Sequence, residues 1–482
     1  MPGAKPFPQL ENAKVTVMGL GRFGGGVGVT RWLVEQGARV HVTDRTGEDD
    51  LRDSVNAIQD LIDTGDVTTR LGDHDGADFI ETDLVIVNPA VPQPWNNTYL
   101  KAAEHCRVPC LTEIELLTAA LPRRDRVIGV TGSAGKSTTA SLIAHMLRKT
   151  LPDEHRVFFG GNIGGTLLSE LHEITEQDWV VLELSSAMLH WLSNQAWSPG
   201  IGVLTNITPN HLDWHGSLDH YIECKHHITR FQEDGDLLIR TAGPPNLPDT
   251  DPPCVCHTKV ITTDDPPPRR QFAPLIGMHN HLNAGLAGLA AFEAFERTTG
   301  HEMPSEAYIS AQRSFRGLPH RLEHLGVFRI GGDNAADGIG AINDSKCTTP
   351  VALALAVAAV RETFPTSRIH LIAGGYDKQV DLQPIGVAAR DCATVAAIGA
   401  VGPTIVSTVT GHAPDCTILD AGTLEEAVAA IKPRLGAGDT ILLSPGCASW
   451  DQFTNYEARG EAFLRALEAH FGPALDLTST PE

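Results

Sequence analysis

Short runs of Val, Ile and Leu alternate with helical patterns along the whole chain, and this alternation constrains the fold more than any other feature. Near-continuous apolar strands separated by helices are typical of parallel sheets that are covered on both faces. We therefore expect an α/β fold. The predicted strands are Lys14–Leu20, Arg39–Thr43, Asp83–Val87, Arg126–Val130, Trp179–Leu184, Ile201–Thr205, Arg368–Ala373, Thr394–Ile398 and Thr440–Leu443.

Three of these strands run into glycine-rich loops, near Gly19, Gly132 and Gly374. A chain of 482 residues has room for about three domains of ~150 residues each. We expect a Rossmann-like domain at residues 1–112, a central P-loop ATPase-type parallel sheet at 113–317 and a Rossmann-like domain at 318–482. A proline-rich insertion at 242–274 lengthens the middle domain, and the Ala-rich segment 351–360 is expected to be a buried helix.

Composition excludes several classes of protein. Asp+Glu 59 against Lys+Arg 37 gives a net charge of -22, so no overall basic field is available to bind nucleic acid. No apolar run approaches the roughly 20 residues of a membrane-spanning helix, and the N-terminus lacks a signal-peptide core. The nine cysteines show no disulfide framework. We expect a soluble cytoplasmic monomer without nucleic-acid or membrane partners.

The first glycine loop, Gly19-Leu20-Gly21-Arg22-Phe23-Gly24, follows a strand and opens a helix, and Asp44 ends the next strand twenty residues later. This arrangement is typical of dinucleotide-binding folds, in which glycines allow a pyrophosphate to approach the helix N-terminus. The pattern favours a nucleotide-type ligand over a nicotinamide cofactor. A glycine turn kept only for helix–sheet packing is the alternative.

The second loop, Gly129 to Thr138 with the sequence GVTGSAGKST, is the more specific motif. Backbone N–H groups of Gly132, Ser133, Ala134, Gly135 and Lys136 can surround phosphates, Lys136 can reach the β/γ oxygens, and Ser137 can bind Mg²⁺. Val130 stands where the strict pattern has glycine, so Gly132 supplies the turn. The motif predicts ATP or GTP binding.

Groups suited to metal and acyl chemistry follow in the same domain. Glu183 ends a buried strand, where an acid is costly unless it is paired or bound to a cation. His211, Asp213 and His215 are three potential metal ligands within five residues, although some could merely cap a helix. Lys225 by itself is most simply a solvated lysine.

The last third places polar groups after strands of a third sheet. These are Arg321, Asn343-Asp344-Ser345-Lys346, Gly375-Tyr376-Asp377-Lys378 and Ser449-Trp450. Singly each is as well explained as a loop, but together they put Arg, Asp, Lys and Ser on one ligand edge. Cys447 has no histidine tied to it by a local motif and is expected to be a packed thiol.

Taken together, these motifs resemble the Mur ligase family from about Val15 to Phe463. The marks are GVTGSAGKST, GGNIGG at 160–165, LELSSAML at 182–189, NITPNHLDWHG at 206–216, GMHNHLNAGLA at 277–287, GLPHRLE at 317–323 and NDSK at 343–346. SPGCASWDQFTNYEARG at 444–460 resembles the members that add D-glutamate. The resemblance implies ATP-dependent addition of D-glutamate to UDP-N-acetylmuramoyl-L-alanine through an acyl phosphate.

The resemblance also implies roles for individual residues. Lys136, His211 and Lys225 would be catalytic, with Lys225 carbamylated, and two Mg²⁺ ions would be held by Ser137, Glu183, His211 and Lys225. ATP would contact Gly132–Thr138, Asn280, Asn283, Arg321, Asp344 and Lys346. The substrates would contact Phe23, Arg45, Asn88, Pro89, Ala90, Asn162, Lys378, Ser449, Trp450 and Tyr456.

Some positions depart from the family pattern. Asn210 stands where an aspartate is usual, and an amide cannot act as a base or an anionic ligand. Tyr376 interrupts the usual Gly-Asp-Gly-Lys spelling, and Trp450 replaces an aliphatic residue. A folylpolyglutamate synthase would lack the first glycine loop, and a nicotinamide dehydrogenase would leave GKST unexplained. A nucleotide-regulated binding protein without turnover stays open because of Asn210.

Overall fold

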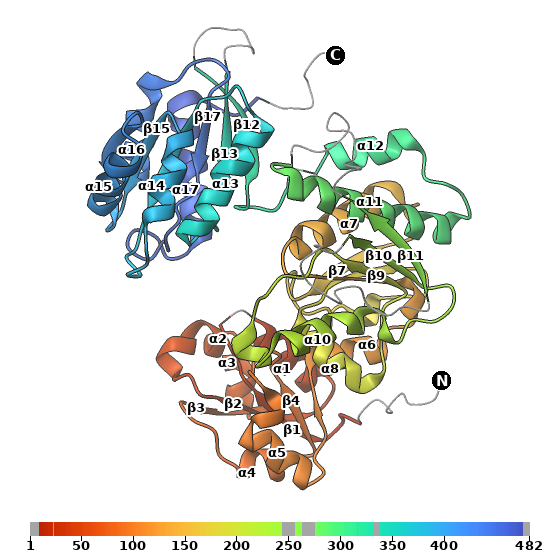
Figure 1. The fold of residues 1–482 in the computed structure, drawn as a ribbon. Helices are drawn as coiled ribbons and strands as arrows, with labels where there is room; N and C mark the ends of the chain where they lie inside the picture. Colours follow the sequence, from red (N-terminus) through yellow and green to blue (C-terminus); the bar gives the residue numbers. More distant parts are fainter. Residues whose placement is uncertain are drawn as a thin grey trace. The chain divides into compact units, whose positions relative to one another are not determined.

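A computed structural model describes residues 9–22, 24–242, 256–262, 275–315, 317–330 and 338–475. The chain divides into two compact units, one of residues 1–266 with 282–308 and the other of 267–281 with 309–482. The first unit contains two parallel sheets and the second contains one mixed sheet (Figure 1). No helix in the described segments is long and apolar enough to cross a membrane.

The first sheet of the first unit is entirely parallel, in the order β3-β2-β1-β4-β5. Apolar side chains of α1 pack on one face, and those of α4 and α5 pack on the other. Both faces of β1 and β4 are therefore buried, which explains why their sequences are continuous apolar runs. The elements are β1 (Lys14–Met18), α1 (Gly25–Glu35), β2 (Arg39–Asp44), α2 (Arg52–Asn56), α3 (Gln59–Thr64), β3 (Val67–Leu71), α4 (Ala77–Ile80), β4 (Leu84–Val87), α5 (Thr98–His105) and β5 (Cys110–Leu111).

The second sheet is also parallel, in the order β11-β10-β9-β6-β8-β7. Strand β6 lies between β8 and β9, so the loops after these three strands meet at one edge. The elements are α6 (Glu113–Ala120), β6 (Val127–Thr131), α7 (Lys136–Thr150), β7 (Val157–Gly161), β8 (Trp179–Glu183), α8 (Ser186–Leu192), β9 (Ile201–Leu204), α9 (Leu212–His215), α10 (Leu218–Arg230), β10 (Leu237–Thr241), β11 (His257–Ile261), α11 (Met278–Thr299) and α12 (Ser305–Arg313).

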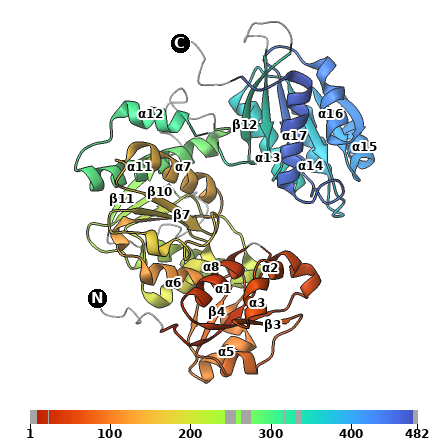
Figure 2. The same ribbon diagram turned by 180° about the vertical axis from the view of Figure 1, so that it is seen from behind.

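The sheet of the second unit has the order β12-β13-β17-β14-β15-β16, with only β12 antiparallel to its neighbour. Helices α13, α14 and α15 cover one face, and α16 and α17 cover the other (Figure 2). The elements are β12 (Glu323–Arg329), β13 (Gly338–Asn343), α13 (Pro350–Thr363), β14 (Ile369–Gly374), α14 (Gln383–Ala388), β15 (Thr394–Ile398), α15 (Gly402–His412), β16 (Thr417–Gly422), α16 (Leu424–Ile431), β17 (Thr440–Leu443) and α17 (Tyr456–Phe471).

The predicted α/β fold class with three sheets is confirmed, and each of the nine predicted strands is present. Polar or glycine-containing strands were not predicted, such as β3 with its exposed Thr68–Arg70 and β7 with the sequence VFFGG. The prediction of a buried helix at 351–360 is wrong for one face of α13, because Val351 is 62% and Leu355 68% exposed. Most of the proline-rich insertion lies outside the described residues, and the domain boundaries stay predictions.

Candidate active site

The GKST loop turns sharply between β6 and α7, and two glycines make the turn possible. Gly132 has φ +147°, and a Cβ there would lie 1.9 Å from Thr205 Oγ1. Gly135 has φ +84°, and a Cβ there would lie 2.4 Å from Asn283 Oδ1. Any larger residue would push the loop away from β9 and α11. The backbone can therefore pass close to both elements and open directly into the N-terminus of α7.

Asn206, at the end of β9, binds the same loop from the other side. The N–H of Ala134 donates to Asn206 Oδ1 at 3.0 Å, and the N–H of Ser133 donates to the Asn206 carbonyl at 2.8 Å. Two of the five donors predicted to surround phosphates are thus already paired within the protein. The first turn of α7, with Lys136, Ser137 and Thr138, presents the N–H groups of a helix N-terminus at this edge.

Two lysines meet at one carbonyl oxygen of this loop. The Nζ of Lys136 donates to the Gly132 carbonyl at 2.9 Å, and the Nζ of Lys225 donates to the same oxygen at 2.8 Å. Lys225 comes from α10 and is only 1% exposed. Burial, followed by repulsion from Lys136, holds the pKa of Lys225 well below its usual range. The structure thus places a buried lysine, rather than a solvated one, beside the phosphate loop, and its burial disfavours the charged form.

Lys225 is also in contact with Tyr221 one turn earlier on α10. Its Nζ lies 4.8 Å from the centre of the Tyr221 ring, and the Tyr221 hydroxyl lies 2.7 Å from Ser133 Oγ. Burial raises the pKa of the Tyr221 phenol, so this hydroxyl stays protonated. The contact with Ser133 joins α10 to the loop at a second point.

Glu183 ends β8 next to the loop and is 1% exposed. Its Oε1 accepts a hydrogen bond of 2.8 Å from Asn162 Nδ2, and the Asn162 N–H donates to the Glu183 carbonyl at 2.9 Å. Its Oε2 is buried without a hydrogen-bond partner among the described residues. A buried carboxylate oxygen without a donor is costly, and a hard divalent cation is the partner that such an oxygen suits. The residues present therefore fit a Mg²⁺ ion.

The loop after β9 separates the three potential ligands that lie close in the sequence. His211 is exposed and adopts a left-handed conformation with φ 50°, and Asn210 Oδ1 accepts its N–H at 2.9 Å. Asp213 is exposed. His215 is buried, with Nε2 2.9 Å from Ser186 Oγ, and burial lowers its pKa to about 3. Only His211 of the three is a solvent-facing imidazole on this loop.

The first glycine loop is fixed by the acid that follows it. Asp44 Oδ2 accepts the Gly21 N–H at 3.1 Å, and its Oδ1 accepts the Thr46 N–H at 2.8 Å. Asn88 Oδ1 accepts the Ala90 N–H at 3.0 Å, and Pro89 accepts a hydrogen bond from the Trp214 indole. Arg45 is exposed at the same edge of the sheet, after β2. Phe23 lies outside the described residues.

Two predicted ATP contacts lie on α11. Asn280 is buried and donates to the Ile276 carbonyl at 2.9 Å. Asn283 is buried against Gly135 of the phosphate loop. Asn283 therefore lies directly against the phosphate loop.

In the second unit, predicted ATP-binding side chains lie between β13 and α17. Asp344 Oδ2 accepts from Ser444 Oγ at 2.8 Å and its Oδ1 accepts from the Leu322 N–H at 3.1 Å. Burial raises the pKa of Asp344 to about 6, and the charge of the exposed Arg321 opposes that shift. Lys346 Nζ donates to the Tyr456 hydroxyl at 3.0 Å and lies 4.7 Å from its ring.

Predicted D-glutamate contacts gather after β14 and β17 of the same sheet. Lys378 Nζ lies 4.9 Å from the Trp450 ring, and the Tyr376 and Trp450 rings are 5.6 Å apart. Trp450 is 64% exposed, whereas Ser449 is buried. Arg459 supports this region from α17, since it is 1% exposed and donates to the carbonyls of Ser345 and Cys447. No local motif singled out Arg459.

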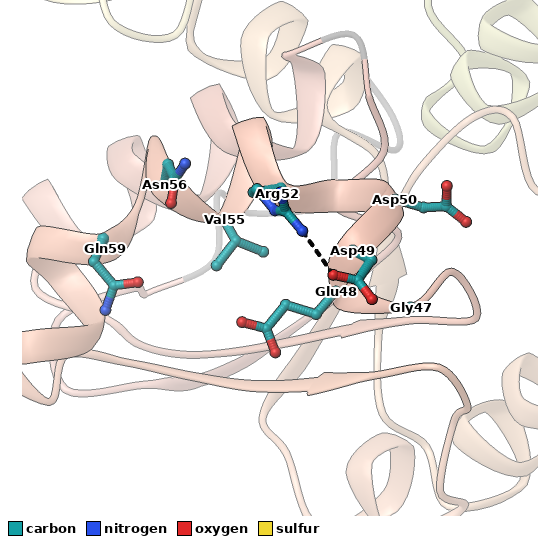
Figure 3. A pocket seen from close by; sticks show the side chains of 8 residues that line it. All are labelled: Gly47, Glu48, Asp49, Asp50, Arg52, Val55, Asn56 and Gln59. Atoms are coloured by element: carbon teal, nitrogen blue, oxygen red, sulfur yellow. Dashed lines mark hydrogen bonds and ion pairs between the residues drawn. The ribbon is translucent and has the colours of Figure 1, made fainter.

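A separate surface pocket of about 630 Å³ lies beside α2 and contains none of the predicted site residues (Figure 3). Its wall carries the carboxylates of Glu48, Asp49 and Asp50, and Arg52 forms an ion pair of 2.8 Å with Asp49. An acidic wall repels phosphate groups. The pocket is therefore no candidate for the nucleotide site.

Two regions of the chain match known protein families. The Mur ligase middle domain matches residues 130–248, and the Mur ligase glutamate ligase domain matches residues 327–447. The chain is 35% identical to UDP-N-acetylmuramoylalanine--D-glutamate ligase of Roseiflexus sp. (strain RS-1), over 96% of this chain and 99% of the relative. The chain belongs to the Mur ligase family. The ligase of the same name from Acidobacterium capsulatum is 32% identical, over 97% of this chain and 98% of the relative.

Solved structures agree on the fold of this Mur ligase. UDP-N-acetylmuramate-alanine ligase MurC from Thermotoga maritima superposes with a TM-score of 0.54 at 20% identity, over 95% of this chain and 100% of that one. MurF from Acinetobacter baumannii superposes with a TM-score of 0.51 at 14% identity, over 95% and 91%. The family predicted from the motifs is confirmed.

Sequence reasoning gave no role to Asn206 or Tyr221 and gave Asn162 a substrate role only. Asn206 accepts hydrogen bonds from two N–H groups of the phosphate loop. Asn162 orients Glu183, and Tyr221 joins α10 to the loop. Asn162 was assigned to the substrate, although its side chain contacts the candidate metal ligand. The strand-end positions of Asn206 and Asn162 are the only signal that could have suggested these contacts.

Proposed function

We propose that this Mur ligase catalyses the ATP-dependent addition of D-glutamate to UDP-N-acetylmuramoyl-L-alanine, a cytoplasmic step of peptidoglycan precursor synthesis. One observation carries the proposal. Relatives named for this reaction are 30–35% identical over nearly the whole chain, and the chain keeps the phosphate loop intact between Thr131 and Lys136.

The reaction must activate a carboxylate, because a free carboxylate does not react with an amine at neutral pH. An oxygen of the alanyl carboxylate attacks the γ-phosphorus of ATP, and the bond from that phosphorus to the bridging oxygen breaks to release ADP. The amine of D-glutamate then attacks the acyl carbon, and phosphate leaves as the new amide forms. The amine gives up one proton to solvent or a base.

Lys136 is positioned to stabilise the phosphoryl transfer. Its ammonium donates to the carbonyl oxygens of Gly132 and Ser133 within the loop, which holds the positive charge where the phosphates would lie. The N-terminus of α7 adds N–H groups and a favourable dipole at the same place. Electrostatic stabilisation of this kind is a large part of catalysis in phosphoryl transfer.

Ser137, Glu183, His211 and Lys225 are the candidate metal ligands. A bound Mg²⁺ would neutralise charge that develops on phosphate and carboxylate oxygens. Glu183 supports this assignment with its unpartnered Oε2, and Asn162 holds the carboxylate in one orientation through Oε1. Asn210 does not add a negative ligand, because its amide is uncharged, and its Oδ1 accepts the His211 N–H.

We further propose that Lys225 is carbamylated. A neutral amine attacks CO₂ and loses one proton, which yields an N-carboxylate with two anionic oxygens. Burial lowers the pKa of Lys225 and so favours the neutral amine, which is the form that reacts with CO₂. The product would supply hard oxygen ligands near Glu183, whose charge already acts on Lys225.

The two ends of the chain would hold the substrates. Arg45, Asn88, Pro89 and Ala90, which follow strands of the first sheet, would bind the UDP end, together with Phe23. Lys378, Ser449, Trp450 and Tyr456 would bind D-glutamate, and Asn280, Asn283, Arg321, Asp344 and Lys346 would bind ATP. The exposed cation of Lys378 over Trp450 suits a carboxylate group.

The test is release of phosphate from ATP in the presence of UDP-N-acetylmuramoyl-L-alanine and single amino acids. We expect release with D-glutamate and none with L-glutamate, L-alanine or a diamino acid. Release with a folate and L-glutamate would instead indicate a folylpolyglutamate synthase. ATP binding without release for any combination would indicate a regulatory nucleotide-binding protein.

A further inference from the structure

A cluster of metal-ligating side chains lies between α8 and α10, apart from the groups assigned above. It consists of His190 on α8 and of His220 and Cys224 on α10, whose ligand atoms all lie within 4.8 Å of one another. Cys224 Sγ is 3.5 Å from His220 Nε2 and 3.9 Å from His190 Nδ1. The proposed reaction uses none of the three.

These separations are close to those of ligands that share one ion. In a tetrahedral zinc site, Zn–N is about 2.0–2.1 Å and Zn–S about 2.3 Å, so neighbouring N and S ligands lie roughly 3.5 Å apart. The Cys224–His220 distance matches this value, and the Cys224–His190 distance exceeds it by a few tenths of an ångström. The ligand atoms of His190 and His220 lie within 4.8 Å of one another, so the side chains would draw closer together as they bind the ion.

The donor set determines which ions suit the cluster. Two imidazoles and one thiolate prefer borderline and soft transition metals, whereas Mg²⁺ and Ca²⁺ prefer oxygen. Burial lowers the pKa of His190 to about 4 and also lowers the pKa of His220, so both imidazoles are neutral and can coordinate. The nearby Glu223 carboxylate makes the local field more negative, which favours a cation.

A fourth residue already orients one of the ligands. His215 Nδ1 lies 3.0 Å from His220 Nδ1, while His215 Nε2 lies 2.9 Å from Ser186 Oγ. This contact engages His220 Nδ1 and leaves Nε2 directed at Cys224. Metal-binding histidines almost always have such a partner on the second ring nitrogen.

An aromatic wall encloses the cluster. The Trp95 ring lies 4.5 Å from His220 and 5.3 Å from His190, and the Trp214 ring lies 5.5 Å from His190. Cys224 is 1% exposed, whereas the two histidines are half-buried. The half-buried imidazoles would leave the cluster open to an ion from solvent, and the bound ion would lie against a buried thiol and flanking aromatic rings.

We propose that His190, His220 and Cys224 form a three-ligand site for a borderline transition-metal ion, with Zn²⁺ the best match and a water completing the tetrahedron. On binding, the thiol releases its proton to solvent as the S–metal bond forms. The ion would join α8 to α10 immediately beside Lys225, so its occupancy would restrain the helix that holds Lys225 against the phosphate loop.

Cobalt provides the test, because a thiolate bound to Co²⁺ gives a near-ultraviolet charge-transfer band that oxygen ligands do not give. Untagged full-length protein is stripped with a chelator and titrated with Co²⁺. We expect one equivalent to produce the band, together with the visible bands of a tetrahedral ion, and Zn²⁺ to remove both. Cys224→Ser should abolish the band, and His190→Asn and His220→Asn should each weaken Co²⁺ binding at least about tenfold.

Matched controls separate this site from other thiols and histidines. Cys106 and His172 are exposed, so Cys106→Ser and His172→Asn should keep the band and the affinity of the wild type. A wild type without the band, a band that persists in Cys224→Ser, or equal losses in the controls would overturn the proposal. Circular dichroism checks folding, and His190→Asn, which retains the thiol, decides the matter if Cys224→Ser does not fold.

Discussion

Lys225→Met is the substitution that best separates a chemical role of Lys225 from a structural one. Methionine has a similar length and no polar group, so it can occupy the space of a lysine that is 1% exposed. The Gly132 carbonyl would lose the 2.8 Å bond from Lys225 but keep the 2.9 Å bond from Lys136. No backbone acceptor would be left without a partner.

The expected effect on stability is therefore small. One net hydrogen bond contributes about 0.5–1.5 kcal/mol, and a volume-conserving apolar replacement costs less than about 1.5 kcal/mol. Removing a buried amine that ionises poorly also ends its desolvation cost, which offsets part of the loss. We expect the free energy of unfolding to change by less than about 1.5 kcal/mol.

The expected effect on turnover is large. Loss of one preorganised electrostatic contact to a transition state typically costs 10²–10³-fold, about 3–4 kcal/mol. Phosphate release at saturating substrates measures this loss, and chemical denaturation measures stability in parallel. In Lys225→Ala, which leaves a cavity, formate or acetate should restore part of the activity, because the added carboxylate supplies the oxygens of the carbamate.

Lys149→Met is the matched control, because Lys149 is an exposed lysine near the end of α7. It should keep the activity and the stability of the wild type. The reasoning is refuted if Lys225→Met keeps more than about a tenth of wild-type turnover, a difference of ~1.4 kcal/mol in barrier. Loss of activity without carboxylate rescue in Lys225→Ala would retain a role for the amine and reject the carbamate.

Three further substitutions test other groups of the site. Lys136→Ala should reduce phosphate release at least about 100-fold, while the affinity for the UDP substrate, measured by calorimetry, should stay unchanged. If phosphate release is retained, Lys136 does not bind the phosphates. Glu183→Gln should raise the Mg²⁺ concentration needed for half-maximal turnover without lowering the unfolding midpoint, since Oε2 has no described partner to lose; a lower midpoint would contradict this. Asp344 has a folded pKa of about 6 against an ordinary 3.8, so the wild type should lose about 2 kcal/mol of stability relative to Asp344→Asn as pH rises from 4.5 to 7.5, out of about 3 kcal/mol over the whole titration. Denaturation at pH 4.5 and 7.5 measures the difference, and equal values at both would reject the raised pKa.

Features that depend on neighbouring residues could be predicted from the sequence. The strands β1, β4, β6 and β9 read as apolar runs because both of their faces are covered, and a run of four or five residues records that burial directly. The GKST loop could also be predicted from neighbouring residues. Its turn needs positive φ values close to Thr205 and Asn283, and glycine, here Gly132 and Gly135, is the residue that allows them. The family followed from such motifs.

The tertiary structure alone decided what each polar group contacts. Lys225 looked like a solvated lysine, but α10 buries it 93 residues away from its partner Gly132. Asn162 contacts Glu183 because two strands end next to each other, and His190 contacts Cys224 because two helices pack together. In both pairs the two residues are distant in the sequence. The physical reason is that pairing, burial and pKa depend on distance in space, whereas a sequence pattern records only which face of an element is apolar.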